Sequence, residues 1–391
     1  MVLTGLEQII MKLPSKLAGK RIGILCHAAS ITRDFTHVTR HFQNSKDCTL
    51  SAVFGPQHGL YGQTQDNMIE WEGETDPVLK VPVYSLYGEH RKPSADMLAG
   101  IDALLVDLQD VGARLYTYIW TVKLCIEACC ENGIPVWILD RPNPIGKLPL
   151  DGPVLKNEFF TFVGGAEIPL CHRMTIGEMA LWIKDKYYRS ADLKIVWMKG
   201  WHRHSLFSET GLPWVLPSPN MPTPQTAVVY PGTVLAEALN ISEGRGTTIP
   251  FELIGAPFIN EEKLKSELDK RHIPGCVFRI HNFIPTFNKY NGMLCHGIQI
   301  HVSSHEDYFP VGTALELIDS IIQTSASDTL SFNPPPYEYE RELMPFDILS
   351  GDSLMRISLM NCYPVEQEKE RWQGETEEFR KEFRDFSAYS E

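Results

Sequence analysis

The N-terminal half of the chain repeats one pattern, in which a short, continuous apolar run is followed by a stretch with helical character. Such runs are typical of strands buried on both faces of a parallel sheet, with the connecting helices covering the two faces. Four runs are identified, at Arg21–Cys26, Thr49–Phe54, Ala103–Asp107 and Pro135–Leu139. The pattern predicts an α/β fold built on a Rossmann-like, mostly parallel sheet.

Two helices are predicted between these strands, over Ile119–Asn132 and Met174–Arg189. The first ends at Asn132-Gly133, a pair that favours the left-handed geometry of a helix C-terminus. The second begins at Thr175, with Glu178 three residues later, which is the pattern of a capping box.

A chain of 391 residues exceeds what one hydrophobic core usually supports, so two domains are expected. A proline-rich stretch over 212–231 is interpreted as the crossover between them. We therefore predict a Rossmann-like catalytic domain over 1–228 and a smaller mixed α+β domain over 229–391 that closes the cleft. In the second domain, a strand is predicted over 297–303, helices over 263–270 and 314–323, and a peripheral helix after Glu366.

Charge and hydropathy exclude several classes of protein. The net charge of -13 argues against binding to nucleic acid or to anionic lipid, because both need a basic surface. No apolar run is long enough to span a membrane, and charged residues interrupt every candidate leader near the N-terminus. The nine cysteines include no Cys-x-x-Cys pair and indicate reduced thiols. A cytoplasmic location is expected.

Several chemistries lack their sequence signatures. The turn after the first strand is His27-Ala28-Ala29-Ser30 and carries no Gly-x-Gly-x-x-Gly, which disfavours dinucleotide binding. A Gly-x-Ser-x-Gly elbow and a His-Glu-x-x-His zinc motif are also missing. His202 and His204 lie two residues apart, a spacing more common in a strand or loop than in a metal site. We expect no cofactor and no metal.

A loop rich in glycine and polar residues follows the second predicted strand, from Phe54 to Pro77. In open α/β sheets, ligands bind beyond the carboxyl ends of the strands, where this loop begins. Met68 and Trp71 add apolar surface beside carboxylates, which suits a sugar ring and raises a carboxyl pKa. A solvated surface loop is the alternative. The polar candidates of this loop are Gln57, His58, Gln65, Asp66, Asn67 and Glu70.

A second polar cluster follows the third strand, between Val106 and Trp120. Its candidates are Asp107, Gln109, Asp110, Arg114, Tyr116 and Tyr118. The structural alternative is that Asp110 caps the following helix and pairs with Arg114, which contributes at most about 1 kcal/mol at an exposed site.

Two further loops complete the set of candidates. Leu139–Gly146 follows the fourth strand and presents Asn143 between prolines, and three strand-end loops of one sheet are expected to converge on one cleft. In the second domain, Glu243 and Arg245 lie in a Gly-rich segment that is not a phosphate-binding loop, because Gly-Lys-Ser/Thr is missing. These two residues reach the cleft from the other side or form a plain turn.

The chain resembles the exo-β-N-acetylmuramidase family across nearly its whole length. The matching segments, in order, are FGPQHG, PVYSLYG, DLQDVGARLYTY, LDRPNPIG, DGPVL, MTIGE, SPNMPT, YPGT, SEGRGTT and PFELIGAP. The resemblance implies a Rossmann-like N-terminal domain, a smaller C-terminal domain and a cleft between them. It also implies hydrolysis of the β-1,4 bond that releases terminal, non-reducing N-acetylmuramic acid from peptidoglycan fragments.

One position departs from the family pattern. Many relatives carry Glu where this chain has Gln57, so a catalytic carboxyl is expected elsewhere. We predict Glu70 as the acid, and either Asp110 or Glu243 as the second carboxylate, or the substrate's own N-acetyl group in its place.

The remaining candidates are predicted to bind the substrate, an amino sugar or muropeptide whose lactyl carboxylate an arginine would hold. They are Gln57, His58, Arg114, Tyr116, Tyr118, Asn143, Glu243 and Arg245. A non-catalytic amino-sugar or muropeptide binder, in which Gln57 marks a lost activity, is the alternative function. The sequence makes no prediction about the oligomeric state.

Overall fold

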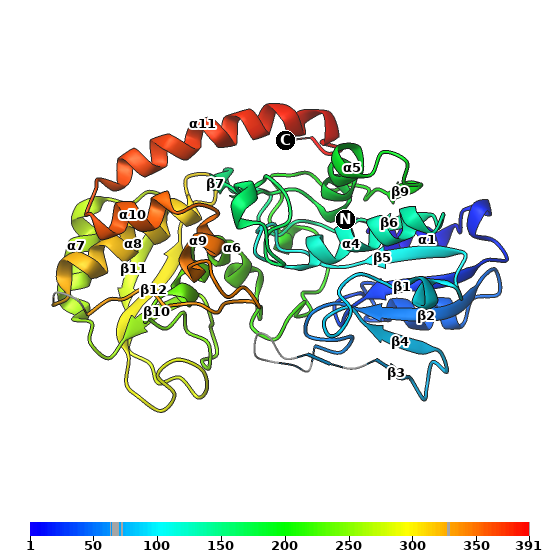
Figure 1. The fold of residues 1–391 in the computed structure, drawn as a ribbon, viewed down its shortest axis with the longest axis horizontal. Coiled ribbons are helices and arrows are strands. Elements are labelled where there is room, and N and C mark those ends of the chain that lie inside the picture. The colour runs from blue at the N-terminus through cyan, green and yellow to red at the C-terminus, as the bar shows by residue number, and fades with distance from the viewer. Residues whose placement is uncertain (63, 65–69, 72, 327–328, 391) are drawn as a thin grey trace.

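The computed structural model describes residues 1–390 apart from 63, 65–69, 72 and 327–328. Within them, a seven-stranded sheet fills the N-terminal part in the order β3-β4-β2-β1-β5-β6-β9 (Figure 1). The short edge strand β3 runs antiparallel to β4, and the other strands pair in parallel. The strands are β1 (Arg21–Cys26), β2 (Thr49–Gly55), β3 (Glu74–Thr75), β4 (Pro82–Ser85), β5 (Ala103–Asp107), β6 (Val136–Leu139) and β9 (Leu193–Val196). The predicted parallel α/β sheet is confirmed.

Alternate side chains of the central strands pack on opposite faces of this sheet. Ile22 and Ile24 of β1 join α1 (Gly5–Met11) and α2 (Val38–Gln43) in one core. Leu104 and Val106 of β5 join the helices of the other face in a second core. Those helices are α3 (Ala95–Leu98), α4 (Tyr118–Glu131) and α5 (Ile176–Tyr187). Burial on both faces explains why the strands lack polar alternation.

The ends of α4 and α5 follow from local sequence. Asn132 caps the C-terminus of α4, and Gly133 takes the left-handed φ of 66° that ends the helix. At the start of α5, the Thr175 hydroxyl accepts a hydrogen bond from the Glu178 amide at 3.2 Å, and the Glu178 carboxylate accepts one from the Thr175 amide at 3.0 Å. Both predicted helices and the capping box are confirmed.

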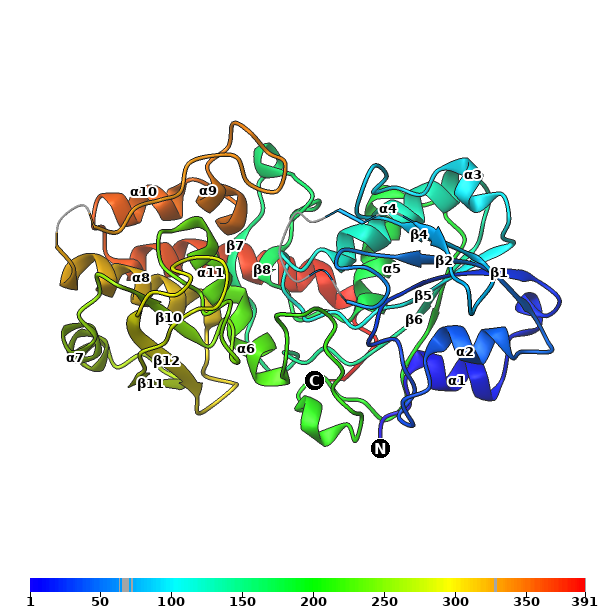
Figure 2. The same cartoon turned by 90° about the horizontal axis from the view of Figure 1, so that it is seen from below.

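The C-terminal part combines a small antiparallel sheet with helices, as predicted. Its strand order is β10-β12-β11, and the helix α6 packs against α8. Figure 2 shows this sheet at the opposite end of the molecule from β1–β6, with β7 and β8 between the two. The elements are β7 (Asp151–Val154), β8 (Pro169–Cys171), α6 (Pro224–Thr233), β10 (Leu253–Ala256), α7 (Glu261–Arg271), β11 (Cys276–Ile280), β12 (His296–Val302), α8 (Pro310–Thr324), α9 (Pro345–Ser350), α10 (Leu354–Met360) and α11 (Val365–Phe383).

The last part of the proline-rich stretch forms the helix α6, and the interpretation of the stretch as the crossover between two domains stays a prediction. Pro224 stands in the first turn of the helix, where a missing N–H costs nothing, and the Thr223 hydroxyl caps the Thr226 amide. The predicted division into residues 1–228 and 229–391 stays a prediction, and its boundary falls within α6.

The C-terminal segment returns to the N-terminal part. Figure 1 shows α11 running from the C-terminal helices towards α5. Trp372 donates a hydrogen bond to Asp151 at 3.0 Å, and Trp182 of α5 donates one to Glu382 at 3.0 Å. No helix within the described residues has the length and apolar character needed to cross a membrane.

Candidate functional site

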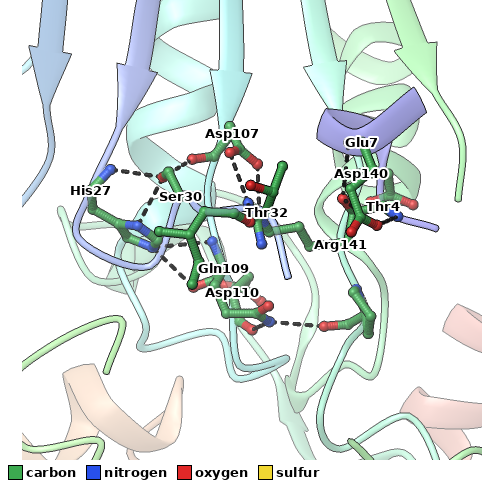
Figure 3. Close-up of polar contacts among 12 residues, drawn as sticks. Thr4, Glu7, His27, Ser30, Thr32, Asp107, Gln109, Asp110, Asp140 and Arg141 are labelled. Atoms are coloured by element: carbon green, nitrogen blue, oxygen red, sulfur yellow. Dashed lines mark hydrogen bonds and ion pairs between the residues drawn. The ribbon is translucent and has the colours of Figure 1, made fainter. Parts of the chain in front are cut away.

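Polar side chains crowd the carboxyl ends of β1, β5 and β6 and bind one another (Figure 3). The Arg141 guanidinium donates to both carboxylate oxygens of Asp107, at 2.6 and 2.8 Å. The His27 ring contacts the Ser30 hydroxyl at 3.1 Å through Nδ1 and accepts from the Gln109 amide at 3.1 Å through Nε2. Burial lowers the pKa of His27 to about 3, so the ring is neutral. This network holds the strand-end loops in place.

Beside these loops lies a concave site, here called the central pocket, which is partly open to solvent. Segments from both parts of the chain line it. The lining residues are Gln57, His58, Leu115, Tyr116, Thr117, Tyr118, Val163, Ser218, Asn220, Met221, Tyr230, Val234, Glu237, Arg245, Phe251, Tyr337 and Glu338.

The loop after β2 contributes Gln57 and His58. The Gln57 side-chain oxygen accepts a hydrogen bond from the Thr117 hydroxyl at 2.6 Å, which fixes the amide so that its Nε2 is the group left to donate. His58 takes a left-handed φ of 68°, and its Nδ1 lies 2.7 Å from the Thr64 carbonyl oxygen.

Aromatic rings form one wall of the central pocket. Tyr116 stands edge-to-face with Tyr118 at 4.8 Å between ring centroids, and with Tyr230 at 5.8 Å. The Tyr118 hydroxyl donates to the Pro217 carbonyl, which fixes that ring. Such a wall is typical of sites that bind a small organic ligand by its apolar face.

Charged groups from the C-terminal part form another wall of the central pocket. The Arg245 guanidinium lies 2.6 Å from a Glu237 carboxylate oxygen and 5.0 Å from the centre of the Phe251 ring. Gly246, which follows Arg245, has a φ of 81°, and a Cβ there would lie 2.8 Å from the Phe287 amide nitrogen. Only glycine therefore fits the turn that carries Arg245.

Glu338 is a second carboxyl group in this wall. Its residue is 5% exposed, and one carboxyl oxygen accepts a hydrogen bond from the Tyr87 hydroxyl at 3.1 Å. Burial raises the pKa of Glu338 to about 7, and the nearby charge of Glu237 adds to the rise.

The structure does not bring the two predicted catalytic residues together in the central pocket. Glu70 is exposed and lines a different hollow, here called the side groove, with Trp71, Tyr84, Glu89 and His90 among its other residues. The assignment of Glu70 as the acid stays a prediction. Gln65, Asp66, Asn67 and Met68 of the same loop lie outside the described residues.

Asp110 is buried, and it does not line the central pocket. One carboxylate oxygen accepts from the Gly112 amide at 2.7 Å, and the same oxygen lies 4.0 Å from Nε2 of the buried His172. Burial raises the pKa of Asp110 to about 7. The structural alternative for this residue is wrong, because α4 begins at Tyr118 with Thr117 as its N-cap.

Three predicted binding residues hold the fold instead. Arg114 is fully buried, and its guanidinium donates to the main-chain carbonyls of Pro153, Ile168, Leu349 and Ser350. A buried arginine engaged in this way ties the two parts of the chain together and does not face the central pocket.

Asn143 and Glu243 are likewise directed into the protein. The Asn143 amide donates to the Met174 carbonyl at 2.7 Å, and its oxygen accepts from the Ile145 amide at 2.9 Å. Glu243 is 1% exposed and lies 3.1 Å from the Lys289 ammonium. The sequence predicts that these residues bind the substrate, but their side chains already bind groups of the protein itself.

The prediction missed Ser218, Asn220, Tyr230, Glu237, Tyr337 and Glu338. Ser218, Asn220 and Tyr230 belong to two of the segments that carry the family resemblance. Glu338 had a weaker signal, which was a carboxylate between two tyrosines after a run of prolines, and Glu237, which stands between two alanines, had none. No group of three or more His, Cys, Asp or Glu side chains among the described residues is arranged to hold a metal ion.

Known proteins match this chain over nearly its whole length. The family model of the exo-β-N-acetylmuramidase NamZ N-terminal region matches residues 22–225, and the model of its C-terminal region matches 228–389. The peptidoglycan β-N-acetylmuramidase NamZ of Bacillus subtilis (strain 168) is 42% identical over 388 residues, which cover 99% of this chain and 91% of that protein.

Two solved structures of DUF1343 family proteins from Bacteroides fragilis also match. One is 30% identical with a TM-score of 0.89, and the other is 27% identical with a TM-score of 0.76. Each alignment covers 100% of this chain and 99% of the other. The chain therefore belongs to the exo-β-N-acetylmuramidase NamZ family.

Proposed function

We propose that this protein is an exo-acting glycosidase that releases terminal, non-reducing N-acetylmuramic acid from peptidoglycan fragments. The observation that carries the proposal is the central pocket, where residues of the family segments meet carboxyl groups from the C-terminal part. Glycoside hydrolysis needs a proton donor and a second group that stabilises or attacks the anomeric carbon. The family membership and the B. subtilis relative support the same activity.

The lining of the central pocket suits one amino-sugar ring. Tyr116, Tyr118 and Tyr230 offer an apolar surface to the face of the ring. Gln57 offers amide donors to sugar or carboxylate oxygens, because its own oxygen is held by Thr117.

The test uses two disaccharides that differ only in the order of their sugars. The purified protein is expected to split N-acetylmuramyl-β-1,4-N-acetylglucosamine into its monosaccharides and to leave N-acetylglucosaminyl-β-1,4-N-acetylmuramic acid intact. Mass spectrometry of the products distinguishes the two results. Cleavage of the second disaccharide would contradict the specificity, and cleavage of neither would contradict the activity.

A non-catalytic binder is the second candidate, favoured by the glutamine at position 57. Titration calorimetry with the first disaccharide separates the two candidates. Heat of binding without the appearance of monosaccharides would support the binder, whereas steady turnover would exclude it.

A further inference from the structure

Two carboxyl groups of the central pocket lie in different electrostatic environments. Glu237 is ion-paired with Arg245 at 2.6 Å and accepts a hydrogen bond from the Tyr337 hydroxyl at 2.7 Å. Glu338 accepts its hydrogen bond from the neutral hydroxyl of Tyr87, at 3.1 Å. In enzymes, neighbouring carboxyl groups whose environments separate their protonation states are the usual acid and base.

The backbone that carries Glu338 is strained. Tyr337 and Glu340 form a two-residue hairpin through main-chain hydrogen bonds of 2.9 and 2.8 Å. Both residues between them have left-handed φ values, 45° for Glu338 and 71° for Tyr339. Turns of this kind normally use Asn-Gly, and a side chain held there at a free-energy cost is typical of a functional site.

Contacts from the N-terminal part hold this turn in place. The Arg91 guanidinium lies 4.1 Å from the centre of the Tyr339 ring and 5.6 Å from that of Tyr87. Because Tyr87 also donates to Glu338, one loop of the N-terminal part fixes both the turn and the carboxyl group.

From this geometry we infer that Glu338 is the catalytic proton donor and that Glu237 is the carboxylate that stabilises the anomeric carbon. The inference rests on the glycosidase function proposed above and deepens it. Neither residue is among the predicted site residues, and both line the central pocket.

The Glu338 carboxyl gives its proton to the glycosidic oxygen while the bond from that oxygen to the anomeric carbon breaks, and the second sugar leaves as an alcohol. Positive charge develops on the anomeric carbon and faces the Glu237 carboxylate. Water then supplies the hydroxyl of the released muramic acid and a proton that restores the Glu338 carboxyl.

The protonation of Glu338 supports this role. Burial raises its pKa to about 7, and the charge of Glu237 in the same wall adds to the rise. Tyr87, Arg91 and Arg245 oppose it more weakly. A carboxyl group with this pKa keeps its proton over much of the neutral range, so kcat/KM should fall as the pH rises above about 7.

The test measures kcat/KM of the Glu338→Gln variant with two substrates. The second sugar of the disaccharide is a poor leaving group unless its oxygen is protonated, whereas the para-nitrophenyl group of para-nitrophenyl β-N-acetylmuramide leaves as a stable phenolate. We expect kcat/KM for the disaccharide to fall roughly 100- to 10,000-fold and that for the nitrophenyl substrate to fall less than about tenfold. With the nitrophenyl substrate, kcat/KM should also no longer decline as the pH rises above about 7.

The control is Glu342→Gln, an exposed carboxylate close to the same turn, which should leave both substrates unaffected. Equal thermal unfolding of the two variants shows that Glu338→Gln is folded. Wild-type protein that turns over neither substrate defeats the proposed function itself. Wild-type turnover with an unimpaired Glu338→Gln variant, or with equal losses on both substrates, overturns the assignment of Glu338 alone.

Discussion

At the scale of single residues, burial distinguishes carboxyl groups that look alike in the sequence. Asp110 and Glu338 have pKa values raised to about 7 because burial disfavours their charged forms. Glu70 is exposed in the side groove.

The first prediction concerns Glu70. Its replacement in Glu70→Gln is expected to change kcat/KM for the disaccharide by less than about threefold, because the side chain lies outside the central pocket. Steady-state kinetics checks this result. A loss of roughly 100-fold or more would restore Glu70 as the catalytic acid and would require the side groove to join the site.

The second prediction concerns the stability contribution of Asp110. Its pKa rises from 3.8 to about 7 on folding, so its contribution is complete at low pH and is lost as the pH rises through about 7. Asp110→Asn keeps the acceptor for the Gly112 amide and removes this loss. At pH values above 7, the variant should gain up to about 4 kcal/mol of unfolding free energy relative to wild type.

Urea denaturation at a series of pH values measures this gain. The exposed Asp96→Asn variant serves as the control and should follow wild type at every pH. An Asp110→Asn curve parallel to that of wild type would show that the buried carboxyl does not titrate on unfolding.

At the scale of elements, α11 connects the two parts of the molecule. Trp372 of α11 is 2% exposed and donates to Asp151, and Asp151 also accepts from the Val311 and Gly312 amides at the start of α8. One carboxylate therefore joins β7, α8 and α11, although they are distant in the sequence.

The third prediction follows from this junction. Trp372→Ala should lower the free energy of unfolding by about 3–5 kcal/mol, because it removes a large buried side chain and a partner of Asp151. Trp372→Phe keeps most of the packing and should cost about 1–2 kcal/mol. Chemical denaturation checks both values. Equal stabilities of the two variants would mean that the packing of the ring contributes nothing, and a Trp372→Phe variant as stable as wild type would mean that the hydrogen bond to Asp151 contributes nothing.

At the scale of the whole molecule, the central pocket exists only because both parts of the chain meet. Arg91 lies over the rings of Phe162 and Tyr339, at 4.7 and 4.1 Å, and thereby links the N-terminal part to the turn that carries Glu338. Cation–π contacts of this kind contribute roughly 0.5–2 kcal/mol.

The fourth prediction is that Arg91→Ala loosens this turn. We expect kcat/KM for the disaccharide to fall about tenfold, corresponding to ~1.4 kcal/mol of lost positioning, with a smaller effect on the nitrophenyl substrate. Exposed Arg189→Ala is the matched control. A variant with full activity on both substrates would show that Arg91 does not position Glu338.

The sheet and its main helices could be predicted because their causes are local. Continuous apolar runs specify buried strands, Thr175 and Glu178 specify a helix start, and Asn132-Gly133 specifies a helix end. The helix α6 was harder to predict, because Pro224 and Pro231 suggest a loop. The packing of α6 against α8, which favours the helix, is known only from the structure.

The sequence also predicted that Gln57, His58, Tyr116 and Tyr118 lie at one edge of the sheet, because the carboxyl ends of parallel strands meet there. It did not separate the side chains that face the central pocket from those, such as Arg114, that turn inward. That choice depends on which carbonyls and carboxylates a side chain meets in three dimensions. The carboxyl of Glu338 likewise acquires its properties from Tyr87, Arg91 and Glu237, because desolvation and charge act through space and not along the chain.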